Sequence, residues 1–136
     1  CIRDRLKRIA DEPRAQIVGH FDLLTKFDEK EHFFDETSLR YRAAALDAMD
    51  ALVSAGKIFE VNTGAISRGW RTTPYPSRWV LEQLKRRNAQ VTISSDSHGV
   101  GTVDCAFDRA KALLEACGFE EIRVFDGKTF AAQKIE

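Results

Sequence analysis

Three short apolar runs in this chain each end in polar side chains, and helix-like segments separate them. The runs occupy residues 15–22, 57–62 and 91–98. Between them, residues 37–55 and 77–87 carry apolar side chains at the three- and four-residue spacing of an amphipathic helix. Apolar strands that alternate with helices are typical of βαβ units, so this order predicts a parallel sheet.

The same alternation extends to both ends of the chain. Residues 2–12 have the spacing of a helix, and residues 103–117 predict another helix that ends at Gly118. Residues 121–125 predict a further strand. About four parallel strands alternating with helices would make an α/β fold, as an open sheet or as part of a (β/α) barrel. A length of 136 residues suits one domain with a real core.

Composition narrows the range of partners. Lys plus Arg and Asp plus Glu both total 21, for a net charge of +0, which favours a small-molecule partner and neither nucleic acid nor membrane. No apolar run approaches the roughly 20 residues that span a bilayer, so we expect a cytoplasmic protein. Cys1, Cys105 and Cys117 lack CxxC spacing, and we expect reduced thiols.

The polar ends of the three runs hold side chains that are suited to metal binding. The pairs are His20 with Asp22, Glu60 with Asn62, and Asp96 with His98. Because the carboxyl ends of parallel strands meet at one edge of the sheet, these pairs should gather there. Imidazole and carboxylate groups are ligands of divalent transition metals, so the pattern predicts a metal site.

Read in order, the segments GHFDLLTKF, EVNTG, SSDSH and GFEEIRVF resemble the carboxyl-terminal half of the PHP (polymerase and histidinol phosphatase) superfamily, in its histidinol-phosphatase branch. The resemblance covers nearly the whole chain. It implies a partial distorted seven-stranded, TIM-barrel-like (β/α) barrel, of which residues 1–136 form the carboxyl-terminal portion. It also implies a metal-dependent phosphomonoester hydrolase of histidine biosynthesis, which cleaves L-histidinol phosphate with two or three divalent ions of zinc, manganese or iron.

The resemblance assigns metal binding to three residues, His20, Asp96 and His98. Lys26 and Arg68 follow the first and second strands, and we expect them to bind the phosphate group of the substrate. No residue is assigned a direct catalytic role.

Three further residues are expected to support the site. Asp22 could cap the next segment or hold a ligand histidine, and the structural role is the favoured one. Glu60 and Asn62 could orient ligands, although a buried, paired Glu60 without a functional role is an equal alternative. His32 lies in a charged segment and is expected to be an exposed loop residue.

The family's amino-terminal His-x-His motif and its next His and Glu ligands are absent from this sequence. We therefore expect a fragment of a larger barrel that is weakly active or inactive alone, with open sheet edges that favour self-association. Two alternatives stay open. The chain could belong to another PHP-type phosphoesterase, such as a nuclease, or it could be a non-catalytic fragment or remnant.

Overall fold

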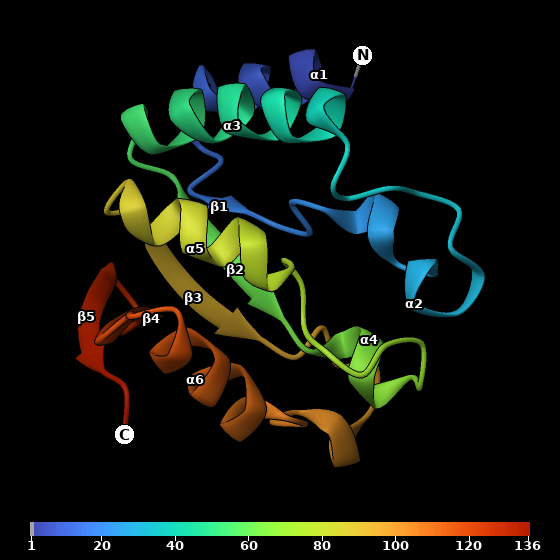
Figure 1. Cartoon of the computed structure of the whole chain (residues 1–136). Helices are drawn as coiled ribbons and strands as arrows, with labels where there is room; N and C mark the ends of the chain where they lie inside the picture. The colour runs from blue at the N-terminus through green and yellow to red at the C-terminus, as the bar shows by residue number, and fades with distance from the viewer. Residues whose placement is uncertain (1) are drawn as a thin grey trace.

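A three-stranded parallel sheet forms the centre of the molecule in the computed structural model, which describes residues 2–136 (Figure 1). Its strands, β1 (Ile17–Val18), β2 (Ile58–Asn62) and β3 (Gln90–Ser94), lie in the order β1-β2-β3. The pairing of β2 with β3 runs from Ile58 opposite Gln90 to Asn62 opposite Ser94. All five residues of β2 are buried, as expected for a strand that is paired on both edges.

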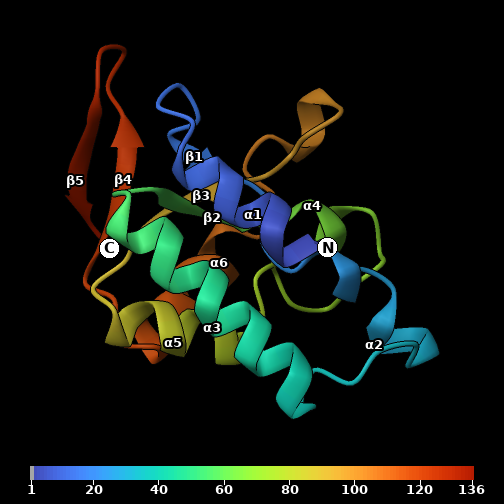
Figure 2. The same cartoon turned by 90° about the horizontal axis from the view of Figure 1, so that it is seen from above.

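Helices connect and cover the strands. The four longer ones are α1 (Ile2–Ala10), α3 (Leu39–Ser54), α5 (Arg78–Arg86) and α6 (Phe107–Ala116). The shorter ones are α2 (Asp28–Glu31), α4 (Gly64–Ser67) and two 3₁₀ turns at Leu23–Thr25 and Val100–Thr102. α1 lies alongside α3 in both views of the chain (Figures 1 and 2). No helix in residues 2–136 is long and apolar enough to cross a membrane.

Local sequence explains where the longest helix, α3, begins and ends. Ser38 precedes it, and the Ser38 hydroxyl accepts a hydrogen bond from the Tyr41 amide at 3.3 Å, which satisfies one of the free amides at the helix start. Gly56 follows it with a φ of 69°, a left-handed conformation that glycine adopts without a steric penalty. The predicted helix at residues 37–55 is confirmed to within two residues at each end.

The core lies between the sheet and the longer helices. It packs side chains of α3, α5 and α6 against side chains of β2: Met49, Leu52, Leu81 and Leu114 from the helices, and Phe59 and Val61 from the strand. Each of these six side chains is fully buried. Burial of one such side chain stabilises the fold by roughly 1.5–3 kcal/mol, so this packing holds the strand ends in fixed positions.

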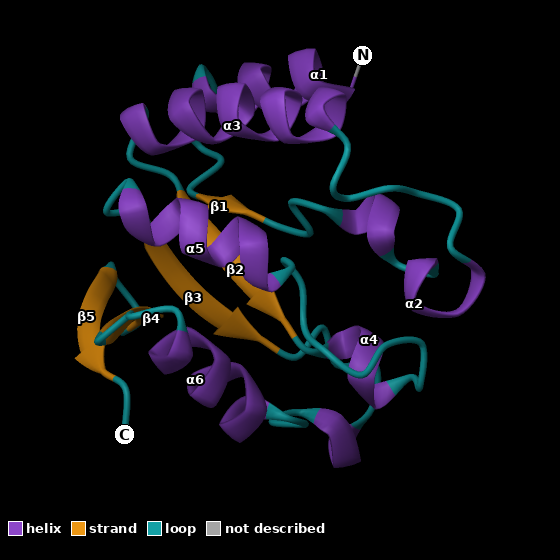
Figure 3. Cartoon of the chain, viewed as in Figure 1, coloured by secondary structure: helices purple, strands orange, loops and turns teal. Residues whose placement is uncertain are grey.

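The expected partial seven-stranded barrel with about four parallel strands is wrong. The last predicted strand, β4 (Glu121–Phe125), pairs antiparallel with a strand that was not predicted, β5 (Phe130–Lys134), in a separate two-stranded sheet (Figure 3). The cause is a tight turn. Asp126 Oδ1 accepts hydrogen bonds from the amides of Lys128 and Thr129, each at 2.8 Å, and Gly127 has a φ of 97°.

This turn brings β5 directly alongside β4, so the backbone groups of β4 pair locally and not with β3. Residues 2–136 therefore form a small α/β fold with three parallel strands, far fewer than the roughly eight that close a barrel. Cys105 and Cys117 are free thiols, and Cys1 lies outside the described residues.

Candidate functional site

The carboxyl ends of the three parallel strands meet at one edge of the sheet. His20 follows β1, Asn62 ends β2, and Asp96 follows β3. His20 Nε2 lies 3.4 Å from Asp96 Oδ2 and 3.2 Å from Asn62 Nδ2. Parallel pairing thus joins an imidazole and a carboxylate from segments that are 76 residues apart.

Bonds from β2 fix the position of His20 and the proton on its ring. The His20 amide donates to Glu60 Oε2 at 3.0 Å, and Glu60 Oε2 lies 3.5 Å from His20 Nδ1. Asn62 Oδ1 accepts the Gly64 amide at 2.9 Å, so its Nδ2 group faces and donates to His20 Nε2. This arrangement places the ring proton on Nδ1 and leaves Nε2 as the acceptor. Glu60 and Asn62 therefore hold His20.

The backbone is unusual at both contacting residues. His20 has a φ of 51° and Asp96 a φ of 47°, in the left-handed region that costs a residue with a side chain about 1–2 kcal/mol. The Glu60 carboxylate accepts a hydrogen bond from the His20 amide, and the Ser94 hydroxyl accepts one from the Asp96 amide at 3.3 Å. Such strain persists where surrounding bonds over-determine it, and it is commonly found at functional sites.

Arg68, the residue after α4, forms hydrogen bonds with Asp96. Its Nη2 donates to Asp96 Oδ2 at 2.8 Å and its Nη1 donates to the Asp96 carbonyl at 3.1 Å. The hydrogen bond from Arg68 holds the pKa of Asp96 below its usual value despite partial burial. Asp96 is therefore an ionised carboxylate with the Arg68 guanidinium and the His20 imidazole as neighbours.

The third predicted metal ligand, His98, is exposed and contacts Arg68 and the Asp96 backbone. His98 Nδ1 is 3.1 Å from Arg68 Nη1 and 2.9 Å from the Asp96 carbonyl. No contact joins the rings of His98 and His20 in residues 2–136. The structure thus brings His20 and Asp96 together and leaves His98 beside them.

His20 and Asp96 suit two positions around one divalent ion. Two ligands at about 2.0–2.2 Å from a tetrahedral metal lie roughly 3.4 Å from each other, and the two atoms here are 3.4 Å apart. Both atoms are acceptors, so a cation between them would replace the repulsion between their lone pairs with an attraction to both. Within residues 2–136 no cluster of three or more His, Cys, Asp or Glu side chains is arranged to hold a metal, so these two residues supply only part of a ligand shell.

Asp22 points away from this site into the protein. It is fully buried, and its Oδ2 accepts the Ser77 amide at 2.7 Å, just before α5. Burial raises the pKa of Asp22 to about 6, although the Ser77 bond and the charge of Arg71 act in the opposite direction. Asp22 therefore ties the end of β1 to the start of α5.

Lys26 and Arg68 both lie against the ring of Trp70, a residue that was not predicted to be part of the site. Lys26 Nζ is 3.9 Å from the centre of the Trp70 ring, and Arg68 Cζ is 4.8 Å from the centre of the same ring. The two predicted phosphate-binding side chains therefore lie against the same aromatic ring. A tryptophan two residues after the predicted arginine was the available signal.

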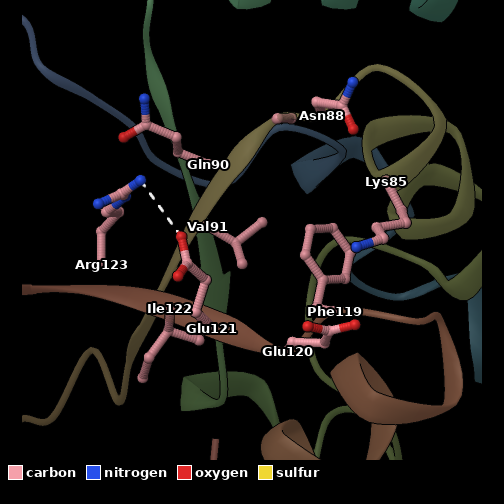
Figure 4. Close-up of a pocket in the computed structure, with 10 residues that line it drawn as sticks. Lys85, Asn88, Gln90, Val91, Phe119, Glu120, Glu121, Ile122 and Arg123 are labelled. Atoms are coloured by element: carbon pink, nitrogen blue, oxygen red, sulfur yellow. Dashed lines mark ion pairs between the residues drawn. The ribbon is translucent and has the colours of Figure 1, made fainter. Parts of the chain in front are cut away.

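A separate polar cavity of about 260 Å³ lies at the opposite end of β3, between the start of that strand and β4 (Figure 4). Lys85, Asn88, Gln90 and Phe119 are among the residues around it. It has no residue in common with the cluster around His20 and Asp96, and it is not part of the candidate site.

His32 forms the end of α2 with a φ of 50° and is exposed, as expected.

No family model matches the chain. A Schizosaccharomyces pombe protein described as "Probable histidinol-phosphatase" is 38% identical over 109 residues, which cover 78% of this chain and 35% of that protein. The "Histidinol-phosphatase" of Bacillus subtilis is 27% identical over 100 residues, which cover 74% of this chain and 35% of that protein. The chain thus spans about a third of the length of the curated relatives that it matches. With the motifs at its strand ends, these similarities show that the chain belongs to the histidinol-phosphatase-like PHP family.

Proposed function

We propose that this chain is part of a metal-dependent phosphomonoester hydrolase that acts on L-histidinol phosphate in histidine biosynthesis. The observation that carries the proposal is the approach of His20 Nε2 to Asp96 Oδ2 at 3.4 Å, at the joined ends of β1 and β3. The similarity to two proteins named histidinol-phosphatases supports the choice of substrate.

In this proposal His20 and Asp96 hold a divalent ion, and His98 is a third ligand whose exposed ring has room to turn. The bound metals, two or three ions of zinc, manganese or iron, would activate a water molecule and offset charge on the phosphate. Such a cluster needs more ligands than these three residues provide. Glu60 would hold His20 in place through the backbone amide, and the hydrogen bond from Asn62 to His20 Nε2 would be replaced by the bond to the metal.

Arg68 and Lys26 are the proposed phosphate-binding residues. A guanidinium group can donate two parallel hydrogen bonds to phosphate oxygens, and an ammonium group offers a point charge. Arg68 already contacts Asp96, so it lies at the border between the metal position and the phosphate position. Phosphate bound by Arg68 would then lie next to the metal, which is the arrangement that phosphoryl transfer requires.

The substrate is proposed to be a small molecule, with no nucleic acid partner, because the net charge is +0. A cytoplasmic location and self-association through the outer edges of β1 and β3, which have no strand partner in residues 2–136, stay predictions.

An exchange of segments tests the function. The matched segment of the Schizosaccharomyces pombe relative is replaced by the corresponding residues of this chain, and phosphate release from L-histidinol phosphate is measured with added Mn²⁺ or Zn²⁺. We expect activity in the exchanged protein and its loss with Asp96→Asn. Asp104→Asn, an exposed acid outside the cluster, is the matched control and should keep activity.

Full activity of the exchanged Asp96→Asn protein would contradict the proposal. The isolated 136-residue chain should release little phosphate in the same assay, and turnover as fast as that of the exchanged protein would contradict the argument that its ligand shell is incomplete.

A further inference from the structure

Two proposed phosphate-binding side chains from different segments approach one aromatic ring. Lys26 follows the 3₁₀ turn after β1, and Arg68 follows α4 after β2. Their distances to the centre of the Trp70 ring are 3.9 Å for Lys26 Nζ and 4.8 Å for Arg68 Cζ. Both distances lie within the roughly 6 Å at which a cation is attracted to the face of a tryptophan.

The two cations differ in what else holds them. Arg68 has hydrogen bonds to the carboxylate and the carbonyl of Asp96. In the part of the chain that the structure describes, Lys26 Nζ has no carboxylate or carbonyl partner, and its contacts are the rings of Trp70 and Phe27, the latter at 5.2 Å. Removal of Trp70 should therefore release Lys26 and leave Arg68 in place.

Contacts of its backbone and of its ring fix the position of Trp70. Its amide donates to the carbonyl of Ala65 in α4 at 2.9 Å, and its ring packs against Phe27 with the ring centres 5.8 Å apart. The preceding residue, Gly69, accepts a hydrogen bond from Lys30 Nζ at 2.8 Å. The ring is thus set by contacts with two separate segments of the chain.

We propose that Trp70 is a positioning residue that holds the Lys26 ammonium on the same ring that Arg68 contacts, ready to bind phosphate. The inference rests on the proposed function, since phosphate is the ligand. A lysine side chain is flexible, and a ring that restricts its ammonium group in advance reduces the freedom that is lost when the anion binds. The Lys26 charge has no carboxylate partner in residues 2–136, so it stays available to an anion.

The first measurement tests the position of Lys26 without any ligand. A tryptophan ring shifts the proton signals of methylene groups that lie over its face, so the Lys26 side-chain signals should be moved upfield in the NMR spectrum of the 136-residue chain. Trp70→Leu should return them to ordinary values, and Trp70→Phe should restore part of the shift. Lys26 signals at ordinary values in the unaltered chain would overturn the inference.

The second measurement is a titration with inorganic phosphate, followed by NMR. Trp70→Leu should weaken phosphate binding about two- to fivefold, the factor that corresponds to an exposed cation–π contact. In a Lys26→Met background, Trp70→Leu should cause no further loss, because the two residues act through one interaction. Trp79→Phe is the matched control, because the Trp79 ring contacts a different cation, with Arg42 Cζ 4.9 Å from the ring centre. The Trp79→Phe variant should bind phosphate as the unaltered chain does.

The two measurements separate the failures. Upfield Lys26 signals that depend on Trp70, in a chain that binds no phosphate, would overturn the proposed phosphate site but keep the placement of Lys26 by Trp70. Phosphate binding that is weakened by Lys26→Met and unaffected by Trp70→Leu would overturn the role of Trp70 alone.

Discussion

Gly64 lies where the site has no room for a side chain, and replacing it with alanine gives a direct test of the packing. A Cβ atom at this position would be 2.7 Å from Arg68 Nη2, 2.9 Å from Asp96 Cβ and 2.9 Å from the Ser95 carbonyl oxygen. Arg68 can move aside because the contact is with the end of a long side chain. Ser95 and Asp96 cannot move so easily, because these contacts are with the backbone and with the first atom of a side chain.

Overpacking of this kind costs about 1–3 kcal/mol of folding free energy. Replacing glycine with alanine also restricts the unfolded chain, which returns about 0.4–1 kcal/mol. We therefore expect Gly64→Ala to lower the free energy of unfolding by roughly 1–2 kcal/mol in a urea titration. The NMR signals of Arg68 and Asp96 should shift as well, because the ion pair between them must rearrange.

Gly101 provides the matched control. It is exposed, and a Cβ atom there would have no neighbour within 4 Å. Gly101→Ala should change stability by no more than about 0.5 kcal/mol. Equal stabilities for Gly64→Ala and the unaltered chain, with unchanged Arg68 and Asp96 signals, would refute the close packing of α4 against the end of β3.

Two further predictions concern charged side chains. Burial raises the pKa of Glu29, but hydrogen bonds from Thr72 and Thr73 outweigh this effect and hold the pKa below 4.5. The stability that this carboxylate adds should therefore be present above pH 4.5. It should be lost as the pH falls through the lower pKa of the folded state. Urea titrations of the unaltered chain and Glu29→Gln should therefore differ most near neutral pH and converge in acid, and a constant difference would count against the assignment. Arg68→Met should raise the pKa of Asp96 toward 3.8, because the hydrogen bond from Arg68 is the main cause of its low value. An NMR titration of the Asp96 carboxyl carbon measures this change, and an unchanged pKa would contradict the pairing.

The regular elements with strong apolar patterns were predictable from the sequence. β2 lies within one residue of the predicted run 57–62. β3 begins one residue before the run 91–98 and ends at Ser94, where the polar end of that run begins. Both strands were predictable because their apolar, β-branched residues fit a buried parallel sheet. β5 was not predictable in this way, since Phe130–Lys134 has the sequence FAAQK without β-branched residues. Its pairing depends on the turn at Asp126 and Gly127, and that turn also removed β4 from the predicted parallel set.

The site was predictable where it depends on strand order, and less so where it depends on side-chain direction. His20 and Asp96 meet because parallel pairing aligns the ends of β1 and β3. The alternation of side chains along a strand placed Asp22 with His20, but the φ of 51° at His20 ends the extended backbone, and Asp22 turns into the core. Trp70 was missed because its role depends on contacts with Lys26 and Arg68, which only the folded chain reveals.

A zinc titration of the 136-residue chain, followed through the ring protons of its three histidines, tests the metal site most directly. We predict that the signals of His20 and His98 change saturably with Zn²⁺, that Asp96→Asn strongly weakens both changes, and that His32, which is exposed at the end of α2, serves as an unaffected internal control. Zinc-dependent changes confined to His32, or a His20 response that is equally strong in Asp96→Asn, would contradict a metal position shared by His20 and Asp96.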